Sequence, residues 1–315
     1  MCLFYFAYGL CIRSNIPLRG LSPLECTSDV QVDVEVQRVA FPPIPEDSLN
    51  QHQADLKPDS ALLFWKNVGK FQVRQGREII IEPEKDVADD LLRPFLLGAA
   101  LPVLLLQRGL FVLHASAVAL RPDGADEAER ALVFMGHSGQ GKSTMAKALN
   151  RRGHRVLADD TVALPFSKHE VPFVYPTIPH LKLRAPSIEA FGEKLADLSR
   201  WNLDDDSFVL PLSPPHNHRP APLRCFYVLE DSISLKVERL PLPEALMSLM
   251  QHSYSMGLLP DSELGHSFEV CVQLVQDVPL FKLSRPRDFE HLPDVVRLVE
   301  EHQNSLARDS NLNIC

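Results

Sequence analysis

The chain has 315 residues and 45% of them are hydrophobic, which is enough for one large domain or two modest ones. Its formal net charge of −9 argues against nucleic acid or an anionic membrane surface as the main partner. The six cysteines form no CxxC pair and no dense cluster, so we expect free thiols in the cytoplasm rather than a disulfide framework or a zinc site.

The first 86 residues predict a small β-rich domain. Apolar or alternating runs of strand length occur at Phe4–Ile12, Val30–Val39, Ala61–Trp65 and Glu78–Ile81. Leu3–Cys11 is apolar like a signal sequence, but no basic residue precedes it and Arg13 follows it, so we interpret it as a strand. No residue of this part suggests catalytic chemistry. Residues 87–315 form the second predicted domain.

The second domain opens with a helix and two strands. Val87–Leu110 has a helical pattern, and its longest uncharged run, Pro94–Leu106, is too short to cross a membrane, which takes about 20 residues. Phe111–Leu120 and Ala131–Met135 are apolar runs on either side of a polar loop. They predict an antiparallel pair of strands that leads into a glycine-rich segment.

That segment, Gly136-x-x-x-x-Gly141-Lys142-Ser143, has the spacing of a phosphate-binding loop (P-loop) and lies between a predicted strand and a predicted helix. A glycine-rich turn before an ordinary helix is the alternative. Glycines let successive backbone N–H groups point at phosphate oxygens, and the helix N-terminus adds partial positive charge. Lys142 is expected at the β- and γ-phosphates, and the Ser143 hydroxyl at Mg²⁺. We therefore expect ATP and Mg²⁺ as cofactors. The expected nucleotide-binding residues are Gly136, His137, Ser138, Gly139, Gln140, Gly141, Lys142, Ser143 and Thr144.

Two carboxylates follow the next predicted strand, His154–Ala158. Adjacent strand residues point to opposite faces, so Asp159 and Asp160 serve one site only if the strand ends or turns there. We assign Asp159 as the base that accepts a proton from the acceptor hydroxyl, and Asp160, with Ser143, as a metal ligand. The exchanged assignment stays open. His114 is a third catalytic candidate that would support the base; an ordinary core histidine is the alternative.

The segment His180–Arg184 alternates between apolar and basic residues. Leu181 and Leu183 are expected to face the core, which leaves His180, Lys182 and Arg184 on the other face. Lys182 and Arg184 are therefore candidate substrate-binding residues, and a solvated strand face is the alternative.

The remaining elements complete an α/β fold with a mixed, largely antiparallel sheet and flanking helices. Asp204–Pro222 is polar and proline-rich, which predicts a mobile loop that serves as a lid or as a plain linker. Further along, we expect a strand pair at Leu223–Leu229 and Ile233–Leu240, a helix at Pro243–His252, a strand at Leu280–Leu283, a helix at Leu292–Glu301 and a frayed end at Asn304–Cys315.

The motifs GHSGQGKST at Gly136–Thr144 and RRGHRVLADDTV at Arg151–Val162 resemble the catalytic domain of HPr kinase/phosphorylase and its relatives. That family has a GxSGxGKS loop, a helix and then RGH-x-x-x-ADD. PHLKLRAP, LRCFYVLE and LPEALMSLMQHSY look like further segments of such proteins. YGLCIRSNIPL looks like the opening of their stand-alone relatives. The resemblance implies an HPr-kinase-like P-loop domain that transfers the γ-phosphate of ATP to a serine hydroxyl. It also implies that Asp159 is the base and that His114 and Asp160 support it.

Two departures bear on the substrate. Thr144 stands where HPr kinases have Glu, and their glycine-rich signature loop is not recognisable. The expected partner is therefore a peptide or protein bearing the acceptor serine, and the resemblance suggests a lasso-peptide precursor, which some relatives phosphorylate. A free-serine kinase and a non-catalytic nucleotide-binding regulator are the alternatives. We expect no nucleic acid and no membrane as partners, and leave homo-oligomerisation open.

Overall fold

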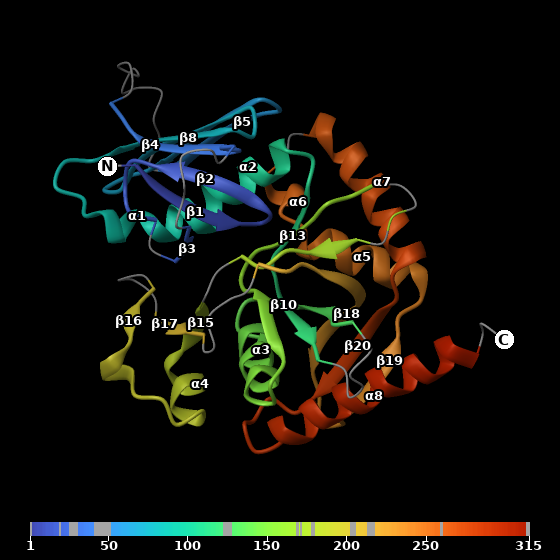
Figure 1. Cartoon of the computed structure of the whole chain (residues 1–315). Helices are drawn as coiled ribbons and strands as arrows, with labels where there is room; N and C mark the ends of the chain where they lie inside the picture. The colour runs from blue at the N-terminus through green and yellow to red at the C-terminus, as the bar shows by residue number, and fades with distance from the viewer. Residues whose placement is uncertain are drawn as a thin grey trace.

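The computed structural model describes residues 2–18, 20–24, 31–40, 52–121, 128–167, 170, 172–177, 180–201, 206–212, 218–258 and 261–312. The architecture is mixed α/β, as the sequence predicts. An eight-stranded sheet formed by the N-terminal part lies beside a seven-stranded central sheet that has helices on its two faces (Figure 1). No helix among the described residues is long and apolar enough to span a bilayer.

The N-terminal sheet has the strand order β3-β1-β2-β4-β8-β7-β6-β5. Its strands are β1 (Leu3–Ala7), β2 (Leu10–Ser14), β3 (Ser22–Pro23), β4 (Val34–Arg38), β5 (His52–Lys57), β6 (Ser60–Trp65), β7 (Gly69–Arg74) and β8 (Glu78–Pro83). The single strand expected at Phe4–Ile12 is a hairpin, because Tyr8 and Gly9 adopt left-handed φ values of 57° and 77° and reverse the chain. The hairpin tip contacts the central part of the molecule, since the Tyr8 N–H donates to the Pro176 carbonyl at 3.3 Å.

The helix expected at Val87–Leu110 consists of three consecutive segments: α1 (Asp89–Phe95), the π-helical η2 (Leu96–Ala100) and α2 (Leu101–Gln107). Its apolar face packs on the N-terminal sheet, where Leu92 and Leu104 share one core with Phe71 and Ile79. The helix therefore belongs to the same hydrophobic core as the first 86 residues.

The central sheet has the order β12-β10-β11-β18-β20-β19, and β14 pairs with β18 at one end. Its strands are β10 (Ala115–Leu120), β11 (Arg130–Met135), β12 (Arg155–Ala158), β14 (Phe173–Val174), β18 (Ala221–Asp231), β19 (Lys236–Arg239) and β20 (Leu280–Arg285). Only β11/β18 and β18/β20 are parallel pairs, so the sheet is mixed and largely antiparallel, as expected. The expected pairing of Leu223–Leu229 with Ile233–Leu240 is wrong, because β20 lies between β18 and β19.

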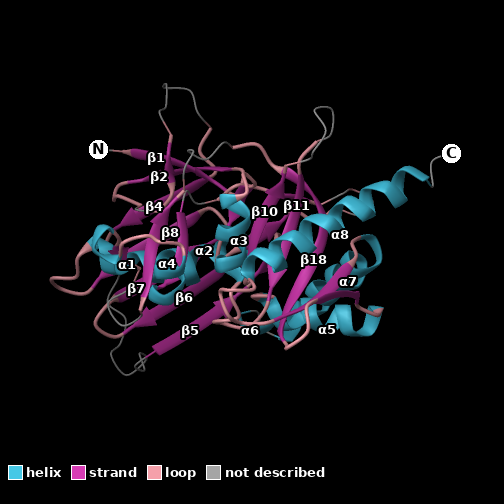
Figure 2. Ribbon diagram, turned by 90° about the horizontal axis from the view of Figure 1, so that it is seen from below, coloured by secondary structure: helices cyan, strands magenta, loops and turns pink. Residues whose placement is uncertain are grey.

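Helices cover both faces of the central sheet. One face carries α3 (Lys142–Arg151), which packs against β10, and α8 (Leu292–Leu312), which runs across β10, β11 and β18 in Figure 2. The other face carries α5 (Leu242–His252) and α7 (Asp261–Asp277), with the short α6 (Ser255–Leu258) between them in sequence. Because α8 continues to Leu312, the fraying expected from Asn304 is wrong over most of that stretch.

A small lobe lies beside α3 and consists of β15 (His180–Arg184), α4 (Ala185–Ala190), η3 (Leu195–Asp197), β16 (Ser199–Arg200) and β17 (Ser207–Pro211) (Figure 1). Its strands form a sheet in the order β15-β17-β16. The loop expected at Asp204–Pro222 therefore contains β17 and the start of β18, while residues 204, 205 and 213–217 lie outside the described part. His180 and Lys182 share one face of β15, as expected, because both contact the ring of Trp201; His180 is buried there, while Lys182 is partly exposed.

Candidate functional site

Two strands leave the central sheet at the same point, and the predicted catalytic residues occupy the two corners. Phe111–Leu120 is broken at His114 into β9 (Phe111–Leu113) and β10. Across from it, Asp159–Thr161 separates β12 from β13 (Val162–Leu164). Because β10 pairs with β12 while β9 pairs with β13 in a separate sheet, both corners fall side by side. This arrangement brings His114 against Asp160.

The P-loop runs from the end of β11 to the start of α3. Gly139 and Gly141 have φ values of 83° and 79°, a region that disfavours residues with a Cβ. Gly141 is the N-cap of α3, so Lys142 and Ser143 form the first turn of the helix. The loop thus places its glycines in left-handed conformations directly before the first turn of α3.

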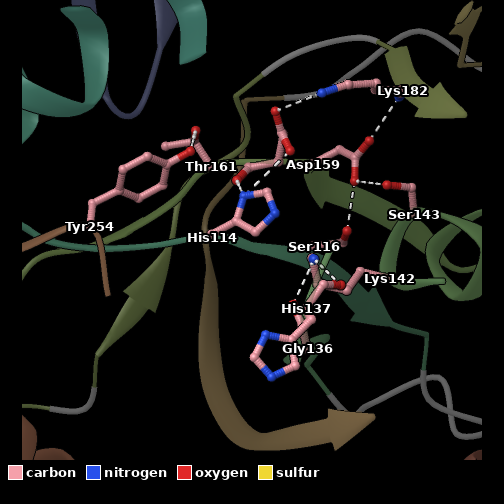
Figure 3. Close-up of polar contacts among 11 residues, drawn as sticks. His114, Ser116, Gly136, His137, Lys142, Ser143, Asp159, Thr161, Lys182 and Tyr254 are labelled. Atoms are coloured by element: carbon pink, nitrogen blue, oxygen red, sulfur yellow. Dashed lines mark hydrogen bonds and ion pairs between the residues drawn. The ribbon is translucent and has the colours of Figure 1, made fainter. Parts of the chain in front are cut away.

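The Lys142 side chain is folded over the beginning of the loop. Its Nζ donates to the carbonyl oxygens of Gly136 at 2.8 Å and His137 at 3.2 Å (Figure 3). Burial lowers the pKa of Lys142, an effect opposed by the carboxylates of Asp160 and Asp159. Its amine therefore lies at the first residues of the P-loop, with both carboxylates close by.

Asp159 is buried and both of its carboxylate oxygens are occupied (Figure 3). Oδ1 accepts hydrogen bonds from the hydroxyls of Ser116 at 2.6 Å and Ser143 at 2.8 Å, and Oδ2 accepts the backbone N–H of Lys182 at 2.8 Å. Burial raises the pKa of Asp159, and the Ser116 hydroxyl opposes that rise. The carboxylate thereby ties α3 to β10 and β15, an arrangement better suited to holding Ser143 than to collecting a proton from a substrate.

Asp160 is the more accessible carboxylate, with a side chain that is 25% exposed. Its left-handed φ of 68° turns the chain between β12 and β13. Its two oxygens lie 3.4 Å from Nδ1 of His114 and 3.5 Å from Nζ of Lys182. The His114 Nδ1–H also donates to the Asp160 carbonyl oxygen at 3.1 Å, so this histidine orients the corner. Burial lowers the pKa of His114, so its imidazole is neutral at pH 7.

A hollow of about 140 Å³ lies in front of these residues, and we call it the phosphate hollow. Its lining combines the P-loop with the two corners and the small lobe: His114, Ser138, Gly139, Gly141, Lys142, Ser143, Thr144, Asp160, Lys182, Leu183, Arg184, Ser187 and Ser207. Lys182 and Arg184 therefore lie with the loop. The lobe is joined to the loop by a hydrogen bond of 3.0 Å between the hydroxyls of Thr144 and Ser187.

Two arginines at the end of β20 also contact the loop, although they were not among the site residues predicted from the sequence. Arg287 donates to the Gly139 carbonyl at 3.1 Å, and Arg285 donates to the Gln140 carbonyl. Asp231 lies 3.5 Å from Arg287 and holds it beside the loop. The signal was available only through topology: β11, β18 and β20 are parallel, and residues after the carboxyl ends of parallel neighbours gather at one edge of a sheet.

The oxygen atoms at Ser143, Asp159 and Asp160 fit the preference of Mg²⁺ for hard ligands. Among the described residues no group of three or more His, Cys, Asp or Glu forms a complete metal cage. This is compatible with Mg²⁺, which proteins usually hold with one or two carboxylates plus phosphate oxygens and waters.

No protein-family model matches the sequence, and no curated protein matches it. Among solved structures, the chain is similar to the HPr(Ser) kinase/phosphatase from Coxiella burnetii, at 12% sequence identity and a TM-score of 0.31. The match covers 62% of this chain and 98% of that chain.

Proposed function

We propose that this chain is an ATP- and Mg²⁺-dependent kinase that transfers the γ-phosphate to a serine hydroxyl of a peptide or protein. The observation that carries the proposal is the hydrogen bond from the P-loop Ser143 to the buried Asp159, with the accessible Asp160 beside it. Phosphoryl transfer needs positioning and neutralisation of charge rather than covalent help from the protein, and these groups supply both.

The triphosphate would lie along the P-loop, with its β- and γ-phosphates near the Lys142 amine. Lys182 and Arg184 line the same hollow, and Arg287 lies beside Gly139. We call Lys182, Arg184 and Arg287 the cationic rim; it is a local cluster of positive charge on a chain whose net charge is −9. The Ser143 hydroxyl would hold Mg²⁺, which neutralises phosphate charge when bound, and Asp159 would position that hydroxyl through its hydrogen bond.

In the proposed reaction Asp160 takes the role of base, which exchanges the two assignments made from the sequence. The acceptor oxygen attacks the γ-phosphorus, and the bond from that phosphorus to the β,γ-bridging oxygen breaks. ADP leaves with the electron pair, and the acceptor proton passes to a carboxylate oxygen of Asp160. His114 and Lys182 keep that carboxylate aimed into the phosphate hollow. Asp159 is unsuited to this step because Ser116, Ser143 and the Lys182 N–H occupy its oxygens.

Labelled ATP tests the proposal directly. The chain is incubated with Mg²⁺ and γ-labelled ATP and offered, in parallel, free serine, HPr and serine-containing peptides that include a lasso-peptide precursor. We expect label on a peptide serine. Label on free serine alone would make the chain a small-molecule kinase. Tight binding of Mg²⁺·ATP with no transfer to any hydroxyl would favour a nucleotide-binding regulator.

A further inference from the structure

A second, larger hollow opens next to the phosphate hollow. It measures about 420 Å³ and includes His114, His137, Gln251, His252, Ser253 and Tyr254 in its lining; we call it the histidine hollow. His114 and Ser138 line both hollows, so the two meet at the corner that carries Asp160. The C-terminal end of α5 supplies the far wall, and it is fixed to this corner because the His114 N–H donates to the His252 carbonyl at 2.9 Å.

The two hollows differ in charge. The phosphate hollow is lined by Lys142, Asp160, Lys182 and Arg184, whereas no Asp, Glu, Lys or Arg is among the described residues that line the histidine hollow. Burial, with a smaller contribution from His137, lowers the pKa of His252 to about 4, so this imidazole is neutral at pH 7. The hollow thus presents neutral polar groups.

Helix polarity adds to this difference. The C-terminus of a helix carries partial negative charge, and the C-terminus of α5 faces the histidine hollow. That end disfavours anions such as phosphates and favours donors such as hydroxyl and amide groups. In contrast, the N-terminus of α3, which carries partial positive charge, lies at the phosphate hollow. The two hollows therefore face helix ends of opposite partial charge.

The position of the Lys142 amine indicates which end of the nucleotide lies nearer the histidine hollow. Nζ donates to the carbonyl oxygens of Gly136 and His137, the first residues of the loop. Both of these residues line the histidine hollow. Because the amine is expected at the β- and γ-phosphates, the γ-phosphate end is the end that faces this hollow.

We propose that the histidine hollow is the acceptor subsite, which admits an uncharged peptide segment and delivers its serine hydroxyl to Asp160. This inference rests on the proposed function and assigns the site's second substrate. His137 and Gln251, joined by a hydrogen bond of 3.2 Å between their Nε2 atoms, form its outer polar wall. They would contact the backbone of the acceptor segment, while the smaller phosphate hollow keeps the triphosphate.

A cysteine introduced at the edge of the histidine hollow allows occupancy of the proposed subsite to be measured. Gln251 is exposed, so Gln251→Cys is compatible with folding, and its alkylation by N-ethylmaleimide reports access to the hollow. Met247→Cys is the matched control, because Met247 is 64% exposed on the same helix and does not line the hollow. The wild-type chain treated in the same way gives the background from native cysteines.

The two ligands are Mg²⁺ with a non-hydrolysable ATP analogue, and the neutral peptide N-acetyl-Gly-Ser-Gly-amide. We expect the analogue alone to leave the alkylation of the Gln251→Cys variant unchanged. The peptide at about ten times its Kd should slow alkylation about tenfold, since only the free fraction reacts, and the control variant should not respond. Protection by the analogue alone would place the nucleoside in this hollow and overturn the proposal. Failure of the peptide to protect at millimolar concentration would also overturn it.

The proposed function has its own readout in the same samples. Binding of a fluorescent ATP analogue by the wild-type chain is measured beside the alkylation rates. If the wild-type chain did not bind the ATP analogue, the kinase proposal would be contradicted. If it bound the analogue but the peptide gave no protection from alkylation, only the proposed acceptor subsite would be contradicted.

Discussion

Ser143 and Asp159 are joined by a hydrogen bond of 2.8 Å that links the first turn of α3 to the end of β12. The bond places the predicted metal-binding hydroxyl and a buried carboxylate in one unit. It also leaves Asp160, the next residue, free to face the phosphate hollow. Two adjacent carboxylates thereby have different surroundings, which is the usual way in which proteins give like groups different roles.

The first prediction concerns the P-loop lysine. Lys142→Ala should reduce phosphate transfer by at least about 10²-fold, because a positioned charge at the transferring phosphate is lost. The fold should be unchanged, as judged by circular dichroism and thermal unfolding. Lys147→Ala, on the same helix but paired with Glu193 at 3.4 Å, is the control and should retain activity. Normal turnover by Lys142→Ala would contradict the P-loop role.

The second prediction concerns the cationic rim. Because Lys182 and Arg184 line the phosphate hollow, Lys182→Gln and Arg184→Gln should each weaken binding of Mg²⁺·ATP several-fold, since partly exposed charge contacts are worth about 1 kcal/mol or less. Added salt should reduce the difference from wild type. Titration with a fluorescent ATP analogue measures it, and Arg239→Gln on β19 is the control. If only the KM for the peptide rose, these residues would belong to the acceptor groove instead.

The third prediction is a pH dependence of stability. Burial lowers the pKa of His252 to about 4, while a histidine in the unfolded chain titrates near 6.5. Below pH 6.5 the unfolded state binds the proton and the folded state does not, so the free energy of unfolding falls as the pH drops toward 4. The loss should be on the order of 2 kcal/mol after allowance for solvent screening.

Urea unfolding at pH 7 and at pH 4.5 measures this dependence. His252→Gln should remove part of it, because the variant has no group to protonate at this position. His266→Gln, at an exposed position on α7, should leave it intact. An identical pH dependence in wild type and His252→Gln would show that this histidine is protonated equally in both states.

The fourth prediction tests whether the second predicted domain folds alone. Leu92, Leu104 and Leu105 are 1%, 0% and 0% exposed in the core that they share with the N-terminal sheet. A chain of residues 87–315 uncovers them, and each buried leucine contributes about 1.5–3 kcal/mol. We expect this fragment to aggregate, as measured by size-exclusion chromatography. A soluble fragment with cooperative unfolding and normal Mg²⁺·ATP affinity would show that residues 87–315 fold independently.

Local patterns in the sequence were sufficient for the strand, loop and helix around Gly136–Ser143, for the antiparallel strands that lead into them and for the position of the two aspartates at the end of a strand. These features depend on glycine spacing and on short apolar runs. The break at His114 was not predictable, because it exists only where β9 leaves β10 to pair with β13. Arg285 and Arg287 were missed for a similar reason, since their place depends on the order of strands in the sheet. The strand β17 was not predicted, because the prolines that neighbour it in the sequence are typical of a loop.

The proposed reaction requires different roles for Asp159 and Asp160, and single-turnover transfer from γ-labelled ATP compares the two residues directly. Asp160→Asn should bind Mg²⁺·ATP like the wild type and transfer phosphate about 10²–10⁴-fold more slowly, the range for loss of a general base. Asp159→Asn should instead raise the Mg²⁺ concentration required, because it disturbs Ser143. Near-normal transfer by Asp160→Asn, with a loss of that size confined to Asp159→Asn at saturating Mg²⁺, would contradict the account.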